Sequence, residues 1–139
     1  MRISVSSARP TGKELSVLFS QVGWGQPGHE LLERSIDAYT ATLCARADDG
    51  ELIGYVSVFS DGVLTTMFGE LVVHPDWRGG GVGRSLLAEV ERMFPAAPIY
   101  VKALGDARGF FEAVGFRCAT VPVTAMFKRP ANASESAGG

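Results

Sequence analysis

Hydrophobic residues in the first part of the chain recur at helical spacing. Between positions 15 and 22 the apolar side chains fall on one helical face, as Leu15, Leu18, Phe19 and Val22. The preceding Thr11-Gly12-Lys13-Glu14 has the form of a capping box, which predicts a first helix from there to about Val22. A short strand is expected before it, around Ile3–Val5. Residues 23–28 hold three glycines and a proline, which break the pattern, and a second helix is expected from His29 to Ala38.

Strand patterns take over at position 40. Residues 40–47 and 52–60 are β-rich runs, and the Asp-Asp-Gly-Glu segment between them is typical of a hairpin turn. A second turn is expected at Asp61-Gly62. It leads toward an apolar strand from Glu70 to His74, which Pro75 ends.

The second half of the chain predicts two further helices among strands. An apolar stripe marks a helix from Gly81 to Phe94, with Val82, Leu86, Leu87 and Val90 on its buried face. A fifth main strand at 99–103 and a short helix at 107–114 follow. The chain then predicts a terminal pair of strands at 116–127, broken near Pro122. This order predicts an α/β fold, a mixed sheet with helices on both faces.

Length and composition restrict the class of protein. The chain has 139 residues, of which 46% are hydrophobic, enough for one domain with its own core, expected over residues 1–128. Residues 129–139 are rich in Ala, Ser and Gly, so we expect a disordered tail there. No apolar run approaches the roughly 20 residues that cross a bilayer, and the start lacks the apolar segment of a secretory signal. We therefore expect a cytoplasmic protein without membrane contact.

Charge and cysteine content argue against other classes. The formal net charge is -2, which argues against binding nucleic acid by neutralising its phosphates. The two cysteines, Cys44 and Cys118, are too few for a disulfide framework, and neither belongs to a metal-ligand cluster. We therefore expect no nucleic-acid partner and no metal.

The most informative segment is a glycine-rich turn between a strand and a helix, within residues 73–87. The first amides of a helix lack carbonyl partners and carry partial positive charge, and glycines let the backbone curl around an anion. Arg78 and Arg84 flank the glycines and can add charge-assisted hydrogen bonds. The segment therefore predicts an anion-binding site, since packing alone does not need so many glycines.

Nucleotide motifs fit this turn poorly. The phosphate loop of nucleotide hydrolases needs Gly-Lys-Ser/Thr, whereas residues 83–85 are Gly-Arg-Ser. The dinucleotide fingerprint G-x-G-x-x-G is not supplied by residues 79–83. A nucleotide-binding protein stays open as an alternative that calorimetry with ATP would separate.

The turn instead resembles the pyrophosphate loop of the GCN5-related N-acetyltransferase (GNAT) superfamily. The family pattern Arg/Gln-x-x-Gly-x-Gly/Ala is matched by Arg78, Gly81 and Gly83. A strand of the form Leu-x-Val-x-Pro precedes the turn, and a second family landmark, Phe-Tyr-x-x-x-Gly-Phe, corresponds to residues 110–116. The resemblance covers roughly Ile3 to Lys128.

The resemblance implies a fold, a cosubstrate and a reaction. A mostly antiparallel twisted sheet would splay between its fourth and fifth strands and admit the pantetheine arm of acetyl-CoA. The acetyl group would pass to a primary amine, on a small molecule or a peptide, by direct attack in a ternary complex. The residues that match the family's cofactor contacts are Leu71, Val72, Val73, Arg78, Gly79, Gly80, Gly81, Val82, Gly83, Arg84, Ser85 and Phe111.

The resemblance also points to catalytic candidates. Glu70, expected to begin the fourth strand, is the candidate general base, because the amine must lose protons before or during attack; an ordinary strand-edge glutamate is the alternative. A backbone amide of Val72 or Val73 would face the thioester carbonyl. The family's acidic tyrosine is replaced here by Phe111, so Tyr100 is a candidate substitute.

Trp24 and His29 join Glu70 as candidates for the acceptor pocket, which we expect between the first two helices. His74 is a second candidate base, although the family commonly carries histidine there without catalytic use. The missing tyrosine suggests an alternative function, a non-catalytic acetyl-CoA sensor or assembly module. The apolar terminal strands at 116–127 predict a homodimer.

Overall fold

The computed structural model describes residues 2–131 of the chain. The chain divides into two compact units, Met1–Lys102 and Ala103–Gly139. The first unit contains the sheet and the helices α1, α2 and α3, and the second contains the short helix α4.

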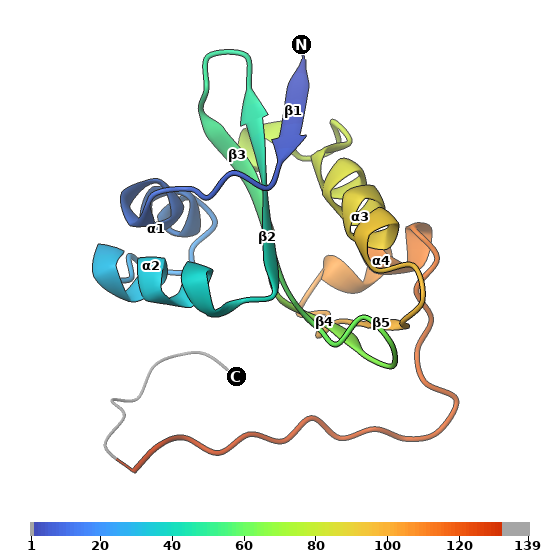
Figure 1. Ribbon diagram of the computed structural model, residues 1–139. Helices are drawn as coiled ribbons and strands as arrows, with labels where there is room; N and C mark the ends of the chain where they lie inside the picture. The colour runs from blue at the N-terminus through green and yellow to red at the C-terminus, as the bar shows by residue number, and fades with distance from the viewer. Residues whose placement is uncertain (1, 132–139) are drawn as a thin grey trace. The chain divides into compact units, whose positions relative to one another are not determined.

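Five strands form one sheet in the first unit, and they follow one another in space as they do in the sequence (Figure 1). The first four pair antiparallel. The fifth is parallel to the fourth because α3 carries the chain back across the sheet. The strands are β1 (Ile3–Ser6), β2 (Ala41–Ala47), β3 (Leu52–Ser60), β4 (Thr66–Val73) and β5 (Ile99–Tyr100).

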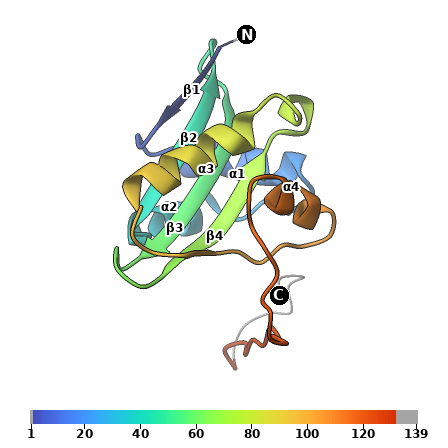
Figure 2. The ribbon, with the colours of Figure 1, turned by 90° about the vertical axis from the view of Figure 1, so that its right-hand side faces the viewer.

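Helices cover both faces of this sheet, as the sequence predicted. The helices α1 (Gly12–Gln21) and α2 (His29–Ala38) lie on one face, and α3 (Val82–Met93) crosses the other (Figures 1 and 2). The apolar sides of α1 and α2 pack into a core cluster with Tyr55 and Val72 of the sheet. On the opposite face α3 approaches closely at Gly54, where a Cβ atom would lie 2.7 Å from Val82 Cγ1.

The predicted capping box begins α1. The Glu14 amide donates to Thr11 Oγ1 at 3.0 Å, and the Thr11 amide donates to Glu14 Oε1 at 3.0 Å. The same carboxylate accepts two hydrogen bonds from Arg46 of β2, at 2.6 and 3.0 Å. The Arg46 guanidinium lowers the pKa of Glu14 to about 2, so this ion pair fastens the start of α1 to the sheet.

The strand β4 is longer than the sequence predicted. It begins at Thr66 rather than at Glu70. Its register with β3 shifts by one residue in the middle of the strand, so Gly69 and Glu70 together lie opposite Ser57, which is a β-bulge. Glu70 therefore lies inside the strand, not at its start.

The strand β5 is shorter than predicted, two residues in place of the expected 99–103. It pairs with β4 only at Thr66 and Met67. Within residues 2–131 no strand pairs with the rest of β4 on that side. The sheet thus opens between its fourth and fifth strands, which confirms the expected splay.

The second unit contains α4 (Ala107–Ala113), which ends as its sequence predicts. Gly115 adopts a left-handed backbone with φ of +102°, a common way to stop a helix. The Phe116 amide donates to the Phe111 carbonyl at 2.9 Å, and the two rings meet edge-on with centroids 5.1 Å apart. The Phe-Phe-x-x-x-Gly-Phe segment is therefore a helix end closed by an aromatic contact.

The prediction of terminal strands at 116–127 is wrong. The structure describes residues 116–131 without a helix or a strand. An isolated pair of short strands has little stability of its own, and Pro122 removes a donor from the middle of the run. Val121, Val123, Met126 and Phe127 are consequently 66–88% exposed.

Within residues 2–131 no helix is long and apolar enough to cross a membrane. That same part of the chain holds no group of three or more His, Cys, Asp or Glu side chains able to bind a metal ion. Cys44 is buried, Cys118 is exposed, and both are free thiols. Burial raises the pKa of Cys44 to about 11, so its thiol is unreactive at neutral pH.

Candidate active site

The glycine-rich turn forms an anion-binding geometry at the start of α3. Gly79 and Gly81 have φ of +81° and +88°, and Gly81 is the N-cap residue of the helix. The first helical bond runs from the Ser85 amide to the Gly81 carbonyl at 3.0 Å. The amides of residues 82–84 precede that bond, so they have no helical carbonyl to donate to. With the exposed guanidinium groups of Arg78 and Arg84 beside them, these amides suit a phosphate or pyrophosphate.

His74 stabilises the approach to this turn. Its Nδ1 accepts the Asp76 amide at 3.0 Å and so caps the short helix η1 (Pro75–Trp77). The His74 side chain therefore positions the turn. This role occupies Nδ1 of the residue that the sequence offered as a second candidate base.

The hydrogen-bond direction along β4 decides which of its amides are free. The His74 amide donates to a carbonyl of β3 at 2.8 Å. Amide directions alternate along an antiparallel strand, so the Val72 amide is also turned toward β3, whereas the amides of Leu71 and Val73 point to the opposite edge. That opposite edge is the one left without a strand partner beyond the start of β4. Of the two expected residues, Val72 and Val73, this geometry favours Val73, which with Leu71 presents its amide at that edge, whereas the Val72 side chain is buried in the core.

The carboxylate of Glu70 is held by side chains from two different elements. Tyr39, the C-cap residue of α2, donates its phenol O–H to Glu70 Oε1 at 3.2 Å. Ser57 of β3 is fully buried and donates its hydroxyl to Glu70 Oε2, while its Oγ accepts the Glu70 amide at 2.8 Å. Glu70 is half-buried, so the carboxylate is fixed in place yet still reaches the surface.

Two tyrosines near this carboxylate are held in the neutral form. Burial raises the pKa of Tyr39, and the charge of Glu70 raises it further. Burial also raises the pKa of Tyr55, again with a contribution from Glu70. Both phenols therefore keep their protons at neutral pH, and that of Tyr39 is donated to Glu70.

Sequence reasoning missed Tyr39 and Ser57. Ser57 did leave a signal, because it is a polar residue within the otherwise apolar run 52–58. Tyr39 left none, since it lies 31 residues before Glu70 and no local spacing connects them.

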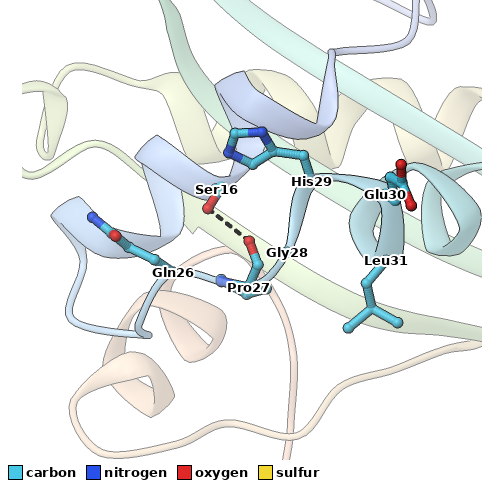
Figure 3. A pocket seen from close by; sticks show the side chains of 7 residues that line it. All are labelled: Ser16, Gln26, Pro27, Gly28, His29, Glu30 and Leu31. Atoms are coloured by element: carbon cyan, nitrogen blue, oxygen red, sulfur yellow. Dashed lines mark hydrogen bonds between the residues drawn. The ribbon is translucent and has the colours of Figure 1, made fainter.

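A pocket of about 480 Å³ opens where the loop between the first two helices enters α2 (Figure 3). The Ser16 hydroxyl donates to the Pro27 carbonyl at 2.9 Å and fixes this loop on α1. Of the predicted acceptor residues, His29 lines the pocket, but Trp24 and Glu70 are not among the residues that form its wall. Those residues are Ser16, Gln26, Pro27, Gly28, His29, Glu30 and Leu31.

Three other predicted residues belong to three different elements or loops. Trp24 packs against Phe19 of α1, with ring centroids 5.3 Å apart, and is 48% exposed. Tyr100 of β5 is 53% exposed, and no hydrogen bond joins it to Glu70 in the described part of the chain. Phe111 is buried and belongs to α4 of the second unit.

Comparison with known proteins identifies the class that this fold and turn define. The sequence model of the acetyltransferase (GNAT) domain matches residues 19–126, so the chain belongs to the GNAT acetyltransferase family. This confirms the resemblance seen in the sequence.

Among curated proteins, aminoglycoside N(6′)-acetyltransferase type 1 of Stenotrophomonas maltophilia is 38% identical over 73 residues, which are 47% of this chain and 48% of that protein. The matched region spans about half or less of the curated relatives. A solved structure of a candidate acetyltransferase from Deinococcus radiodurans R1 is 29% identical with a TM-score of 0.73, covering 92% of this chain and 87% of that one. The GNAT family N-acetyltransferase YhbS of Escherichia coli, solved in complex with CoA, is 24% identical with a TM-score of 0.66, covering 84% of this chain and 69% of that one.

Proposed function

We propose that the protein is an acetyl-CoA-dependent N-acetyltransferase that acetylates a primary amine. The observation that carries the proposal is the glycine-rich turn at the start of α3, with its unpaired amides, next to the open edge of β4. The aminoglycoside acetyltransferase relative and the CoA-bound YhbS support the same cosubstrate and an amine acceptor. The acceptor itself, a small molecule or a peptide N-terminus, is left open by both.

Acetyl-CoA binding is assigned to two parts of the first unit. The amides of residues 82–84 would donate to the pyrophosphate oxygens, and Arg78 and Arg84 would add charge-assisted hydrogen bonds. One of the outward amides of Leu71 and Val73 would bond the pantetheine arm in the manner of an added strand, and the other is left for the thioester carbonyl. Apart from the two arginine contacts, these bonds use backbone groups.

The chemical step joins the amine nitrogen to the acetyl carbonyl carbon and breaks the carbon–sulfur bond. An acceptor amine with a pKa near ~10.4 arrives protonated, and Glu70 takes a proton from it, directly or through a water. The free lone pair then attacks, and the amide of Val73 or Leu71 stabilises the oxyanion. The C–S bond breaks as the carbonyl re-forms. The second nitrogen proton leaves for the departing thiolate or solvent, so the products are the N-acetyl amine, CoA and one released proton.

Phe111 cannot protonate the departing sulfur as the family tyrosine would. A thiol with a pKa near ~8.5 is a good leaving group, so we propose that the thiolate leaves without a side-chain acid. Tyr100 is the alternative donor. In this proposal His29 and Trp24 contact the acceptor rather than the reacting atoms.

The test is Glu70→Gln, which keeps the shape of the side chain and removes its basicity. We expect about a hundredfold loss of kcat with unchanged acetyl-CoA affinity, measured by thiol release across a panel of aminoglycosides, polyamines, amino acids and peptides. Glu91→Gln, an exposed glutamate on α3, is the matched control. An unchanged kcat in Glu70→Gln would remove Glu70 from the mechanism.

A second candidate function, a non-catalytic acetyl-CoA sensor or assembly module, is favoured by Phe111 alone. The same amine panel separates the two. Calorimetric binding of acetyl-CoA without thiol release from any amine would support the sensor, and binding of ATP in place of acetyl-CoA would contradict both proposals.

A further inference from the structure

The position of Tyr39 is determined by more than helix packing. Its ring stacks on Phe59 of β3 with centroids 4.4 Å apart and planes tilted by 40°. Its phenol oxygen lies over the backbone of Gly69 and bonds to Glu70. Three contacts from β3 and β4 thus direct one hydroxyl at the carboxylate.

Gly69 makes room for this hydroxyl. A Cβ atom at position 69 would lie 2.1 Å from Tyr39 Oη, a distance that no side chain tolerates. Gly69 does not have a left-handed backbone, so its conformation does not require glycine. The close approach of the Tyr39 phenol requires it instead.

Tyr39 and Ser57 between them occupy both oxygens of Glu70. Each oxygen accepts one side-chain donor, Oε1 from Tyr39 and Oε2 from Ser57. A carboxylate has about four lone-pair sites, so two are left to accept a proton from a substrate. The carboxylate plane is therefore fixed while its capacity as a base is kept.

We propose that Tyr39 is a positioning residue, which with Ser57 clamps the Glu70 carboxylate toward the acceptor amine, and that Gly69 is glycine to admit this clamp. The inference rests on the proposed function, in which Glu70 is the base. In this role Tyr39 acts through Glu70 rather than on the reacting atoms.

The ionisable groups around Glu70 decide how Tyr39 acts on it. The titratable groups that face Glu70 are Tyr39 from the end of α2 and Tyr55 from β3, with Cys44 of β2 beyond Tyr55. The phenols are neutral at neutral pH, so Tyr39 acts here by its hydrogen bond and not by charge.

The kinetic test is Tyr39→Phe, alone and combined with Glu70→Gln. We expect kcat to fall about tenfold in the single variant and the KM for acetyl-CoA to stay unchanged. In the Glu70→Gln background the substitution should cost nothing more. Ser57→Ala should act in the same direction. Its matched control is Ser20→Ala, which removes a hydroxyl that donates to the Val17 carbonyl within α1.

A second measurement needs no substrate. Tyrosine labelled with ¹³C at the ring carbon that bears the hydroxyl gives three resonances, and Tyr39→Phe assigns one of them. Because the charge of Glu70 raises the pKa of Tyr39, Glu70→Gln should make this phenol ionise at lower pH.

These two measurements separate the possible failures. An ionisation of Tyr39 that does not respond to Glu70→Gln overturns the clamp, whatever the activity. A response in the Tyr39 resonance with full activity in Glu70→Gln overturns the proposed base and the positioning role with it. If Glu70→Gln is slow but Tyr39→Phe keeps the wild-type kcat, Glu70 remains the base and the positioning role alone is overturned.

Discussion

Two glycines of the candidate site show how a missing side chain can serve different physical needs. Gly69 needs space, because the Tyr39 phenol occupies the place of a Cβ atom. Gly81 is required for its backbone conformation, because its φ of +88° lies in the left-handed region. Space is not the reason there, since nothing lies within 4 Å of a Cβ atom built on Gly81. A side chain at Gly81 would therefore strain the backbone without clashing with a neighbour.

Gly81→Val should abolish acetyl-CoA binding while the fold persists. A β-branched residue in the left-handed region costs about 1–3 kcal/mol, and relaxing that strain turns the unpaired amides of residues 82–84 away from a common anion. Calorimetry with acetyl-CoA measures the loss, and far-UV circular dichroism checks that the helices remain.

The matched control for this variant is Gly109→Ala in α4. Gly109 has an ordinary backbone and nothing within 4 Å of a Cβ atom, so the variant should bind acetyl-CoA like the wild type. Micromolar acetyl-CoA affinity in a folded Gly81→Val protein would contradict the pyrophosphate assignment.

At the scale of elements, the start of α1 is held to the sheet by electrostatics as well as by packing. Glu14 closes the capping box and also pairs with Arg46, whose guanidinium further donates to the Gly50 carbonyl at 2.9 Å. The helix start, β2 and the hairpin after it are thereby fastened at one point. Since α1 packs against α2, whose end holds Tyr39, this point belongs to the framework that supports the Glu70 site.

Glu14→Gln should reduce stability at neutral pH but not in acid. In the folded protein the pKa of Glu14 falls from 4.5 to about 2, so the ionised pair stabilises the fold above pH 4.5 and this contribution is lost as the pH falls toward 2. We expect about 1 kcal/mol at pH 7, less than the full pKa change implies, because the Glu14 side chain is 35% exposed and solvent screens the pair.

Urea unfolding at pH 7 and near pH 2 measures this difference. Glutamine retains an oxygen for the capping box, so the comparison isolates the charge. Arg46→Met should remove the same pH dependence from the other side of the pair. A Glu14→Gln protein with the acid sensitivity of the wild type would contradict the assignment.

Elements that depend on local signals were predictable from the sequence, and those that depend on a distant partner were not. The capping box of α1 and the glycine-rich start of α3 were predicted where they occur, because each is built from residues close in the chain. The bulge that carries Glu70 and the length of β5 depend on which strand lies alongside. The contact of Tyr39 with Glu70 joins two elements through a single side chain, which no periodicity reveals.

At the scale of the whole molecule, the chain combines a well-packed sheet with an apolar segment that has no regular structure. The first unit buries its core on both faces of β3, where Tyr55 faces α1 and α2 and Gly54 faces α3. In the second unit the segment 116–131 has no helix or strand to bury its apolar side chains. Exposed apolar side chains in sequence are a common feature of surfaces that associate.

We therefore expect a homodimer in which the segment 116–127 is covered by a second copy of the chain. Val121, Val123, Met126 and Phe127 are 66–88% exposed in the single chain, and burying them between two copies removes apolar surface from water. Light scattering at tens of micromolar should give about twice the chain mass of 14.8 kDa. Val123→Asp should shift the protein toward the monomer, because the dimer would bury the added charge. Thr124→Ser, at the neighbouring polar position, should leave the mass unchanged. A monomeric mass at every concentration would reject the dimer.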